Sequence, residues 1–171
     1  MNDSVVKTSH LILWLLSISL LAVIPARAAS PDPDVIVKRL YAAQASGEGP
    51  FFQTESRARV DKYFTKDFAD LIWNDAVRAG GEVGAIDFDP LYGSQDPDIS
   101  NFEIMETGWG GDDKMGSDDK AVVQVTFKNA GQEQMISFQF QEIRGKWKIT
   151  NIRYPDMDNL LLKEHLEQSS G

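Results

Sequence analysis

The hydrophobic residues change their spacing halfway along the chain, and this change constrains the fold more than any other feature. In residues 33–79, apolar side chains recur three or four positions apart, as in helices that pack one face on a core. In residues 101–154 they alternate with polar ones, as in strands with one buried face. Helices followed by strands predict an α+β domain, in which the helices lie on one face of an antiparallel sheet.

The four helices are predicted from their apolar spacing and, for three of them, from a capping residue before the helix. Asp32 is suited to begin the first helix, Thr65 the third and Asp158 the last, because their side chains can accept a hydrogen bond from a free backbone N–H group. The predicted helices span residues 33–46, 55–64, 66–79 and, near the C-terminus, 159–168.

The strands are predicted from alternation and from the turns that separate them. They span residues 101–109, 121–129, 134–143 and 147–154. The last strand changes phase, with Trp147 and Ile149 on one face and Ile152 and Tyr154 on the other. This change of phase predicts a bulge near Asn151.

The first 28 residues have the pattern of an export signal. Lys7 precedes an apolar run over residues 11–24, and Ala26-Arg27-Ala28 forms a small-x-small cleavage pattern. The run is shorter than the roughly 20 residues of a membrane-spanning helix, so a retained anchor is the weaker alternative. We expect cleavage after Ala28, a single domain over residues 29–171, no membrane insertion after cleavage, and a periplasmic or secreted location.

Composition argues against several kinds of chemistry. The chain has no cysteine, so it has no disulfide and no thiolate nucleophile. Outside the predicted signal only His165 remains, which excludes zinc sites with several histidines and disfavours a Ser-His-Asp triad. A net charge of −9 disfavours nucleic acid as a partner. We therefore assign no catalytic residue, cofactor or metal, and attribute His165 to a favourable interaction with its helix end.

Two acidic stretches are candidates for a cation site. Residues 86–98, IDFDPLYGSQDPD, hold four aspartates, but Pro90, Leu91 and Tyr92 occupy positions where a Ca²⁺ loop needs oxygen ligands. This stretch is better interpreted as a corner between helices and sheet, with its carboxylates accepting backbone hydrogen bonds. Residues 110–120 are interpreted as a solvated hairpin tip.

Aromatic residues from every predicted element are candidates to line a ligand pocket, together with one carboxylate. The ligand-binding candidates are Tyr41, Tyr63, Trp73, Asp89, Tyr92, Trp109, Phe138 and Trp147. Packing in the core is the competing explanation for the aromatic ones. Phe51 and Phe52 are expected to anchor their loop to the core, and Asp75 is expected to be exposed.

Five segments carry a resemblance to a known superfamily. They are DVIVKRLYAAQ (34–44), RVDKYFTKDFADLI (59–72), DFDPLYGSQD (87–96), AVVQVTFKN (121–129) and GKWKITNIRYP (145–155). The chain resembles the nuclear transport factor 2-like superfamily of cystatin-like α+β cones, and within it a family of exported bacterial proteins with no assigned activity. The resemblance implies a strongly curved sheet wrapped on three helices, an apolar pocket in the cone and a homodimer formed through the sheet.

The superfamily includes both enzymes and binding proteins, so fold alone does not decide the function. We expect an exported, non-enzymatic binding or interaction module for a small apolar ligand or an envelope protein. One alternative is an isomerase- or dehydratase-type enzyme that uses aspartate and tyrosine in the cone, and another is a module that docks on an envelope protein. An enzyme of that type would place a buried aspartate within hydrogen-bond reach of a tyrosine.

Overall fold

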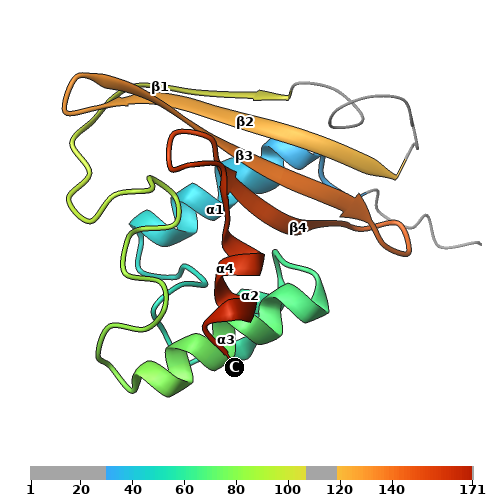
Figure 1. Cartoon of the computed structure of the whole chain (residues 1–171). Helices are drawn as coiled ribbons and strands as arrows, with labels where there is room; N and C mark the ends of the chain where they lie inside the picture. The colour runs from blue at the N-terminus through green and yellow to red at the C-terminus, as the bar shows by residue number, and fades with distance from the viewer. Residues whose placement is uncertain (1–29, 107–118, 171) are drawn as a thin grey trace, which may run out of the picture.

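The helices lie on one face of the sheet, as the change of hydrophobic spacing predicts (Figure 1). The computed structural model describes residues 30–106 and 119–170. Its helices are α1 (Pro33–Ala45), α2 (Arg57–Asp61), α3 (Lys66–Ala79) and α4 (Leu162–Gln168). α1 packs against β1 and β2, and α4 lies between β4 and α3 (Figure 1).

The sheet has five strands in the order of the sequence, each antiparallel to the next. The strands are β1 (Ile99–Glu106), β2 (Lys120–Asn129), β3 (Gln132–Glu142), β4 (Trp147–Tyr154) and β5 (Leu160–Leu161). Arg144 and Gly145, both with positive φ, make the tight turn between β3 and β4. The predicted α+β layout is confirmed.

The predicted bulge in β4 is present. Gln139 pairs with Asn151 and the next residue, Phe140, pairs with Ile149, so Thr150 is the extra residue. The sequence suggested that the apolar side chains before and after the phase change lie on opposite faces of the sheet, and this was wrong. The extra residue in the bulge brings the later apolar side chains back to the face of the earlier ones. The four apolar side chains are all buried in one core: Trp147, Ile149, Ile152 and Tyr154.

The second helix is shorter than predicted, because its last residues pair with the sheet. Ile149 N donates to Tyr63 O at 2.9 Å, and Thr65 N donates to Ile149 O at 2.9 Å. Phe64 thereby forms a parallel bridge with Ile149. These two hydrogen bonds draw the chain out of the helix after Lys62, which caps it.

The terminal helix begins later than predicted. Asp158 and Asn159 both have positive φ, and the turn they make places Leu160–Leu161 beside β4 as a short strand. Asn151 Oδ1 accepts a hydrogen bond from Lys163 N at 3.1 Å, so Asn151 rather than Asp158 satisfies the start of α4. Asp32 and Thr65 occupy the predicted cap positions of α1 and α3, without side-chain cap hydrogen bonds.

One continuous core fills the space between the helices and the sheet. Tyr41 of α1 makes edge contacts with Phe138 of β3, at 6.1 Å between ring centroids, and with Tyr92, at 5.5 Å. Leu40, Phe68 and Phe138 have no exposed surface. Within the described residues, no helix is long and apolar enough to cross a membrane.

Residues 86–98 turn the chain from the helices into the sheet, as predicted. Asp89 N donates to Ser94 O at 2.9 Å, and Asp89 Oδ1 accepts from Leu91 N at 2.8 Å. Phe88 and Leu91 are buried and Tyr92 is half-buried. The predicted use of a carboxylate in backbone hydrogen bonding is confirmed for Asp89.

Candidate functional site

A cleft of about 670 Å³ lies between α3 and the segment that follows it. We call it the α3 cleft. Its walls come from the second half of α3, from residues 81–89 with Gln95, and from Phe52 and Thr54 in the loop between α1 and α2. The loop between α1 and α2 therefore meets α3, and the segment that directly follows α3, in one concave surface.

A left-handed turn after α3 creates this cleft. Gly80, with a φ of 58°, ends the helix, and Gly81, with a φ of 95°, continues the reversal. The returning chain is held by Asp75, whose carboxylate accepts hydrogen bonds from Ala85 N at 2.8 Å and Ile86 N at 3.2 Å. Asp75 is 5% exposed, so the expectation that it would be exposed was wrong.

The last helix fastens the same segment from the other side. The imidazole Nε2 of His165 lies 2.9 Å from Ala85 O. Ala85 therefore contacts α3 through its N–H group and α4 through its carbonyl. This contact gives His165 a structural role in addition to its place in the last turn of α4.

The floor of the α3 cleft is apolar, and its rim exposes apolar side chains to solvent. Ile72, Ile86 and Phe88 are buried beneath it, whereas Phe52 is 57% and Val83 75% exposed. Phe52 has a φ of 56°, a left-handed conformation that is uncommon for an aromatic residue. Exposed apolar groups around a hollow are typical of binding surfaces.

The charge of the α3 cleft is entirely negative. Glu82, Asp87 and Asp89 join Asp75 in its lining, and no lysine, arginine or histidine does. Burial raises the pKa of Asp89, and the hydrogen bond from Leu91 N partly opposes this. In the part of the chain that the structure describes, only Asp75 among these carboxylates has a cationic partner, Arg78 at 3.7 Å.

The predicted ligand-binding residues do not meet in one pocket. Asp89 lines the α3 cleft, while Tyr63 and Trp147 line a separate cavity beside α1. Tyr41, Tyr92 and Phe138 belong to the aromatic packing, and Trp73 is half-buried against the same core. Trp109 lies outside the described residues.

The buried tyrosines Tyr41 and Tyr154 do not form, with Asp89, the arrangement expected of an isomerase. Tyr41 donates its hydroxyl to Leu91 O at 2.6 Å, and Tyr154 donates to Pro90 O at 2.8 Å. Burial raises the pKa of both hydroxyls well above the usual range. Among the described residues, no hydrogen bond joins the carboxylate of Asp89 to a tyrosine hydroxyl.

Sequence reasoning missed the rim of the α3 cleft. Phe51 anchors its loop as expected, with 4% exposure and a ring contact to Phe64, but Phe52 points outward. Val83 and Ile86 follow the glycine pair after α3, where the sequence indicates only a loop. The sequence did contain one signal of an exposed aromatic residue, the adjacent pair Phe51 and Phe52. Two neighbouring side chains rarely point into the same core, so one of the pair could be expected to face solvent.

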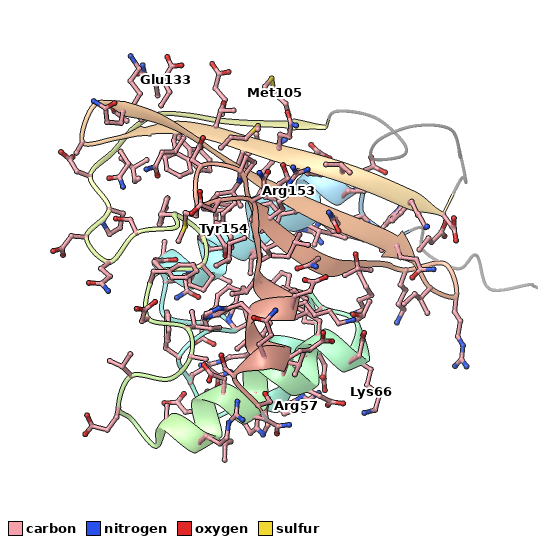
Figure 2. The ribbon with its side chains drawn as sticks, viewed as in Figure 1. Arg57, Lys66, Met105, Glu133, Arg153 and Tyr154 are labelled. Atoms are coloured by element: carbon pink, nitrogen blue, oxygen red, sulfur yellow. The ribbon has the colours of Figure 1, made fainter. Side chains whose placement is uncertain are left out.

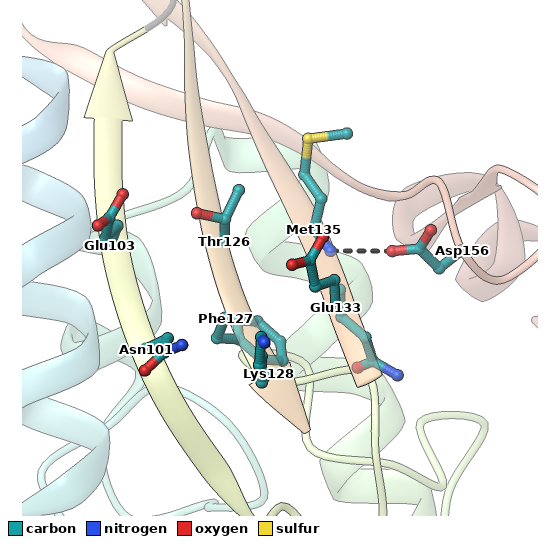
Figure 3. Close-up of a pocket in the computed structure, with 9 residues that line it drawn as sticks. Asn101, Glu103, Thr126, Phe127, Lys128, Glu133, Met135 and Asp156 are labelled. Atoms are coloured by element: carbon teal, nitrogen blue, oxygen red, sulfur yellow. Dashed lines mark hydrogen bonds between the residues drawn. The ribbon is translucent and has the colours of Figure 1, made fainter. Parts of the chain in front are cut away.

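A second hollow, of about 440 Å³, lies on the face of the sheet that the helices leave open (Figure 3). Glu103, Thr126, Lys128 and Glu133 project into it from three adjacent strands. Asp156 closes one side by accepting a hydrogen bond from Met135 N at 2.9 Å. Its charges are of both signs and its lining is mostly polar, as on an ordinary solvated sheet face.

Neither acidic stretch forms a metal site in the residues that the structure describes. No three Asp, Glu or His side chains there are arranged to hold an ion. Most of the second stretch, residues 110–120, lies outside the described residues, as does the predicted signal over residues 1–28.

Comparisons with known proteins place the chain in no family. No protein-family model matches it, and no curated protein matches significantly. A solved structure described as the phospholipid-binding protein from Ralstonia solanacearum in complex with a phospholipid is similar at 16% identity and a TM-score of 0.34. The alignment covers 80% of this chain and 74% of that one. At this level the likeness establishes neither a shared fold nor a shared ligand.

Proposed function

We propose that this chain is an exported, non-enzymatic binding module whose α3 cleft takes a small apolar ligand with a cationic end. One observation carries the proposal: the cleft combines an apolar floor with carboxylates, and no cation lines it. Ligand pockets of this kind are mostly apolar, with a few polar groups that orient the ligand.

The size of the cleft suits a small organic molecule. Pockets for such ligands span about 300–1,000 Å³, and this cleft measures about 670 Å³. The alkyl or aromatic part of the ligand would contact Ile72, Ile86 and Phe88 and would cover the exposed side chains of Phe52 and Val83.

The cationic end of the ligand is inferred from the free energy that it costs to bury carboxylates without a partner. Asp89 is half-buried, and burying an ionised carboxylate without a partner costs free energy. A ligand ammonium group beside Asp89 and Asp87 would offset this cost. Neither aspartate has an ion-pair partner among the described residues.

The remaining parts of the proposal rest on the sequence. Export follows from the signal pattern in residues 1–28, and the order of helices before an antiparallel meander supports a nuclear transport factor 2-like cone. The commitment of Tyr41 and Tyr154 to backbone carbonyls supports binding rather than catalysis. Homodimerisation through the sheet and docking on an envelope protein stay predictions.

The proposal is tested by isothermal titration of octylamine into protein recovered after expression of the full-length sequence. Octylamine is expected to bind near neutral pH, where it is cationic, and octanol, which carries no charge, is expected to bind less tightly. The variant Asp87→Asn/Asp89→Asn should weaken octylamine binding by roughly tenfold, as the loss of charge-assisted contacts predicts.

Asp96→Asn/Asp98→Asn is the matched control. It removes the same charge from exposed positions of the same corner segment that do not line the cleft. An equal loss of affinity in both variants, or equal binding of octanol and octylamine, would contradict the proposal.

A further inference from the structure

A separate cavity of about 430 Å³ lies between α1, the chain that follows α2 and the start of β4. We call it the α1–β4 cavity. Ile36, Tyr63 and Trp147 form its floor, and each is less than a tenth exposed. Pro31 adds a further apolar surface.

The charge of the α1–β4 cavity is opposite to that of the whole protein. The chain has 26 acidic against 17 basic residues, yet Arg39, Lys62, Lys146 and Lys148 line this cavity and no acidic residue does. None of the four has a carboxylate within 4.0 Å in the part of the chain that the structure describes.

Lys148 is a fixed part of this arrangement. Its ammonium donates to Asp61 O at 2.6 Å and to Lys62 O at 2.8 Å, at the C-terminal end of α2. Burial, followed by the charge of Lys146, lowers the pKa of Lys148. Lys146 and Lys148 are therefore two like charges beside one apolar floor.

The other cations lie around the opening. Arg39 and Lys146 are exposed, and Lys62 is exposed with its ammonium 4.9 Å from the centre of the Tyr63 ring. Tyr63 donates its hydroxyl to Arg39 O at 3.3 Å, which ties α1 to the segment that bears Lys62. A solvated basic surface would not need a concave apolar floor at its centre.

We propose that the α1–β4 cavity binds an anionic amphiphile, with its acidic group among Arg39, Lys62 and Lys146 and its apolar part against Ile36 and Trp147. An anion there would be attracted by the cations that line the cavity, and the apolar part would be removed from water. A free fatty acid and a lipid with an acidic headgroup share this chemistry.

The site differs from the α3 cleft in location and in the sign of its charge. Its ligand is therefore distinct from the one proposed for that cleft, and the two proposals fail independently. Octylamine binding should be the same in the wild type and in variants of the α1–β4 cavity.

The test is isothermal titration of octyl phosphate, below the concentration at which it forms micelles, into protein recovered after expression of the full-length sequence. Arg39→Gln/Lys146→Gln should weaken binding by roughly tenfold. Both side chains are exposed, and circular dichroism should show unchanged secondary structure. Added salt should weaken the wild-type interaction, because partly exposed charges are screened.

Lys120→Gln/Lys128→Gln is the control, since it removes the same charge from residues that do not line the cavity. Octanoate represents a free fatty acid, and dihexanoyl phosphatidylglycerol represents a lipid with an acidic headgroup. The one that binds more tightly identifies which of these two kinds of ligand the cavity takes. The proposal is overturned if octyl phosphate does not bind or inorganic phosphate binds as tightly as octyl phosphate. An equal loss of affinity in the control variant also overturns it.

Discussion

The hydroxyl of Tyr154, on β4, donates a 2.8 Å hydrogen bond to the carbonyl of Pro90 inside the core. Figure 2 shows Tyr154 within the molecule, whereas Met105 and Glu133 point away from the helices on the other face of the sheet. The contact ties the corner segment to the sheet. Because this segment includes Asp89, the hydrogen bond also fixes one wall of the α3 cleft.

Tyr154→Phe should lower the free energy of unfolding by about 1–2 kcal/mol, because it leaves the buried Pro90 carbonyl without its donor. Urea denaturation measures the change. Tyr63→Phe is the comparison, since Tyr63 makes a longer bond of 3.3 Å to a partly exposed carbonyl, and it should cost less. Equal losses in the two variants would contradict this account.

Asp89→Asn should raise the melting temperature at neutral pH. The pKa of Asp89 is raised in the folded state, so the folded protein binds a proton at Asp89 more tightly than the unfolded chain does. Stability from this group is therefore highest in acid and declines as pH rises from the unfolded pKa through the folded one. The asparagine carries no charge and retains an oxygen for Leu91 N.

Thermal melts of the wild type and Asp89→Asn over a range of pH check the sign. The advantage of the variant should disappear below about pH 4, where the aspartate is protonated in both states. A variant that is less stable than the wild type at neutral pH would show that the carboxylate charge is stabilising.

Asp67→Asn should have the opposite dependence on pH. The hydrogen bond from Lys163 is the largest cause that lowers the pKa of Asp67, from 3.8 to about 2. The pair joins α3 to α4 and contributes stability above the unfolded pKa, which is lost as pH falls from about 4 to about 2. The Asp67 side chain is 60% exposed, so a loss of only about 0.5 kcal/mol is expected near neutral pH.

Urea denaturation at neutral pH and at about pH 2 measures this difference. Lys163→Gln should lose a similar amount at neutral pH and add little to Asp67→Asn in the double variant. Fully additive losses would mean that the two side chains do not interact in solution.

Gly84→Ala should destabilise the protein and weaken ligand binding in the α3 cleft. A Cβ atom at this position would lie 2.5 Å from Asp75 Oδ2, and that carboxylate already holds Ala85 N and Ile86 N. Relieving the overlap requires the loop or the carboxylate to move, at a cost of about 1–3 kcal/mol. Urea denaturation and octylamine titration should both detect the change, and an unaltered midpoint would contradict the geometry.

Features that depend on local sequence were predicted well. The bounds of α3 follow from its apolar spacing and from the glycine pair after it, and the bulge in β4 follows from the phase change at Asn151. Asp89 was identified as a carboxylate that bonds backbone N–H groups within a corner.

Features that depend on contacts between distant residues were not predicted. The end of α2 is set by two hydrogen bonds with Ile149, more than 80 positions away: Ile149 N donates to Tyr63 O, and Thr65 N donates to Ile149 O. Asp75 is buried because residues 84–86 fold back on it, which its place near a helix end does not indicate. Of the candidate site, Asp89 was among the predicted ligand-binding residues, and the rest was missed because its walls meet only after α3 and the loop that follows it are packed.

The most direct test of the central claim is a methyl NMR titration of the alanine- and isoleucine-labelled protein with octylamine. The methyl groups of Ile72, Ala76, Ala79 and Ile86 line the α3 cleft and should shift in a saturable manner. Those of Ala121 and Ile149, buried beneath the sheet and outside the cleft, should stay unchanged. Shifts confined to other methyl groups, or no saturable shift at the four cleft positions, would contradict a binding site in the α3 cleft.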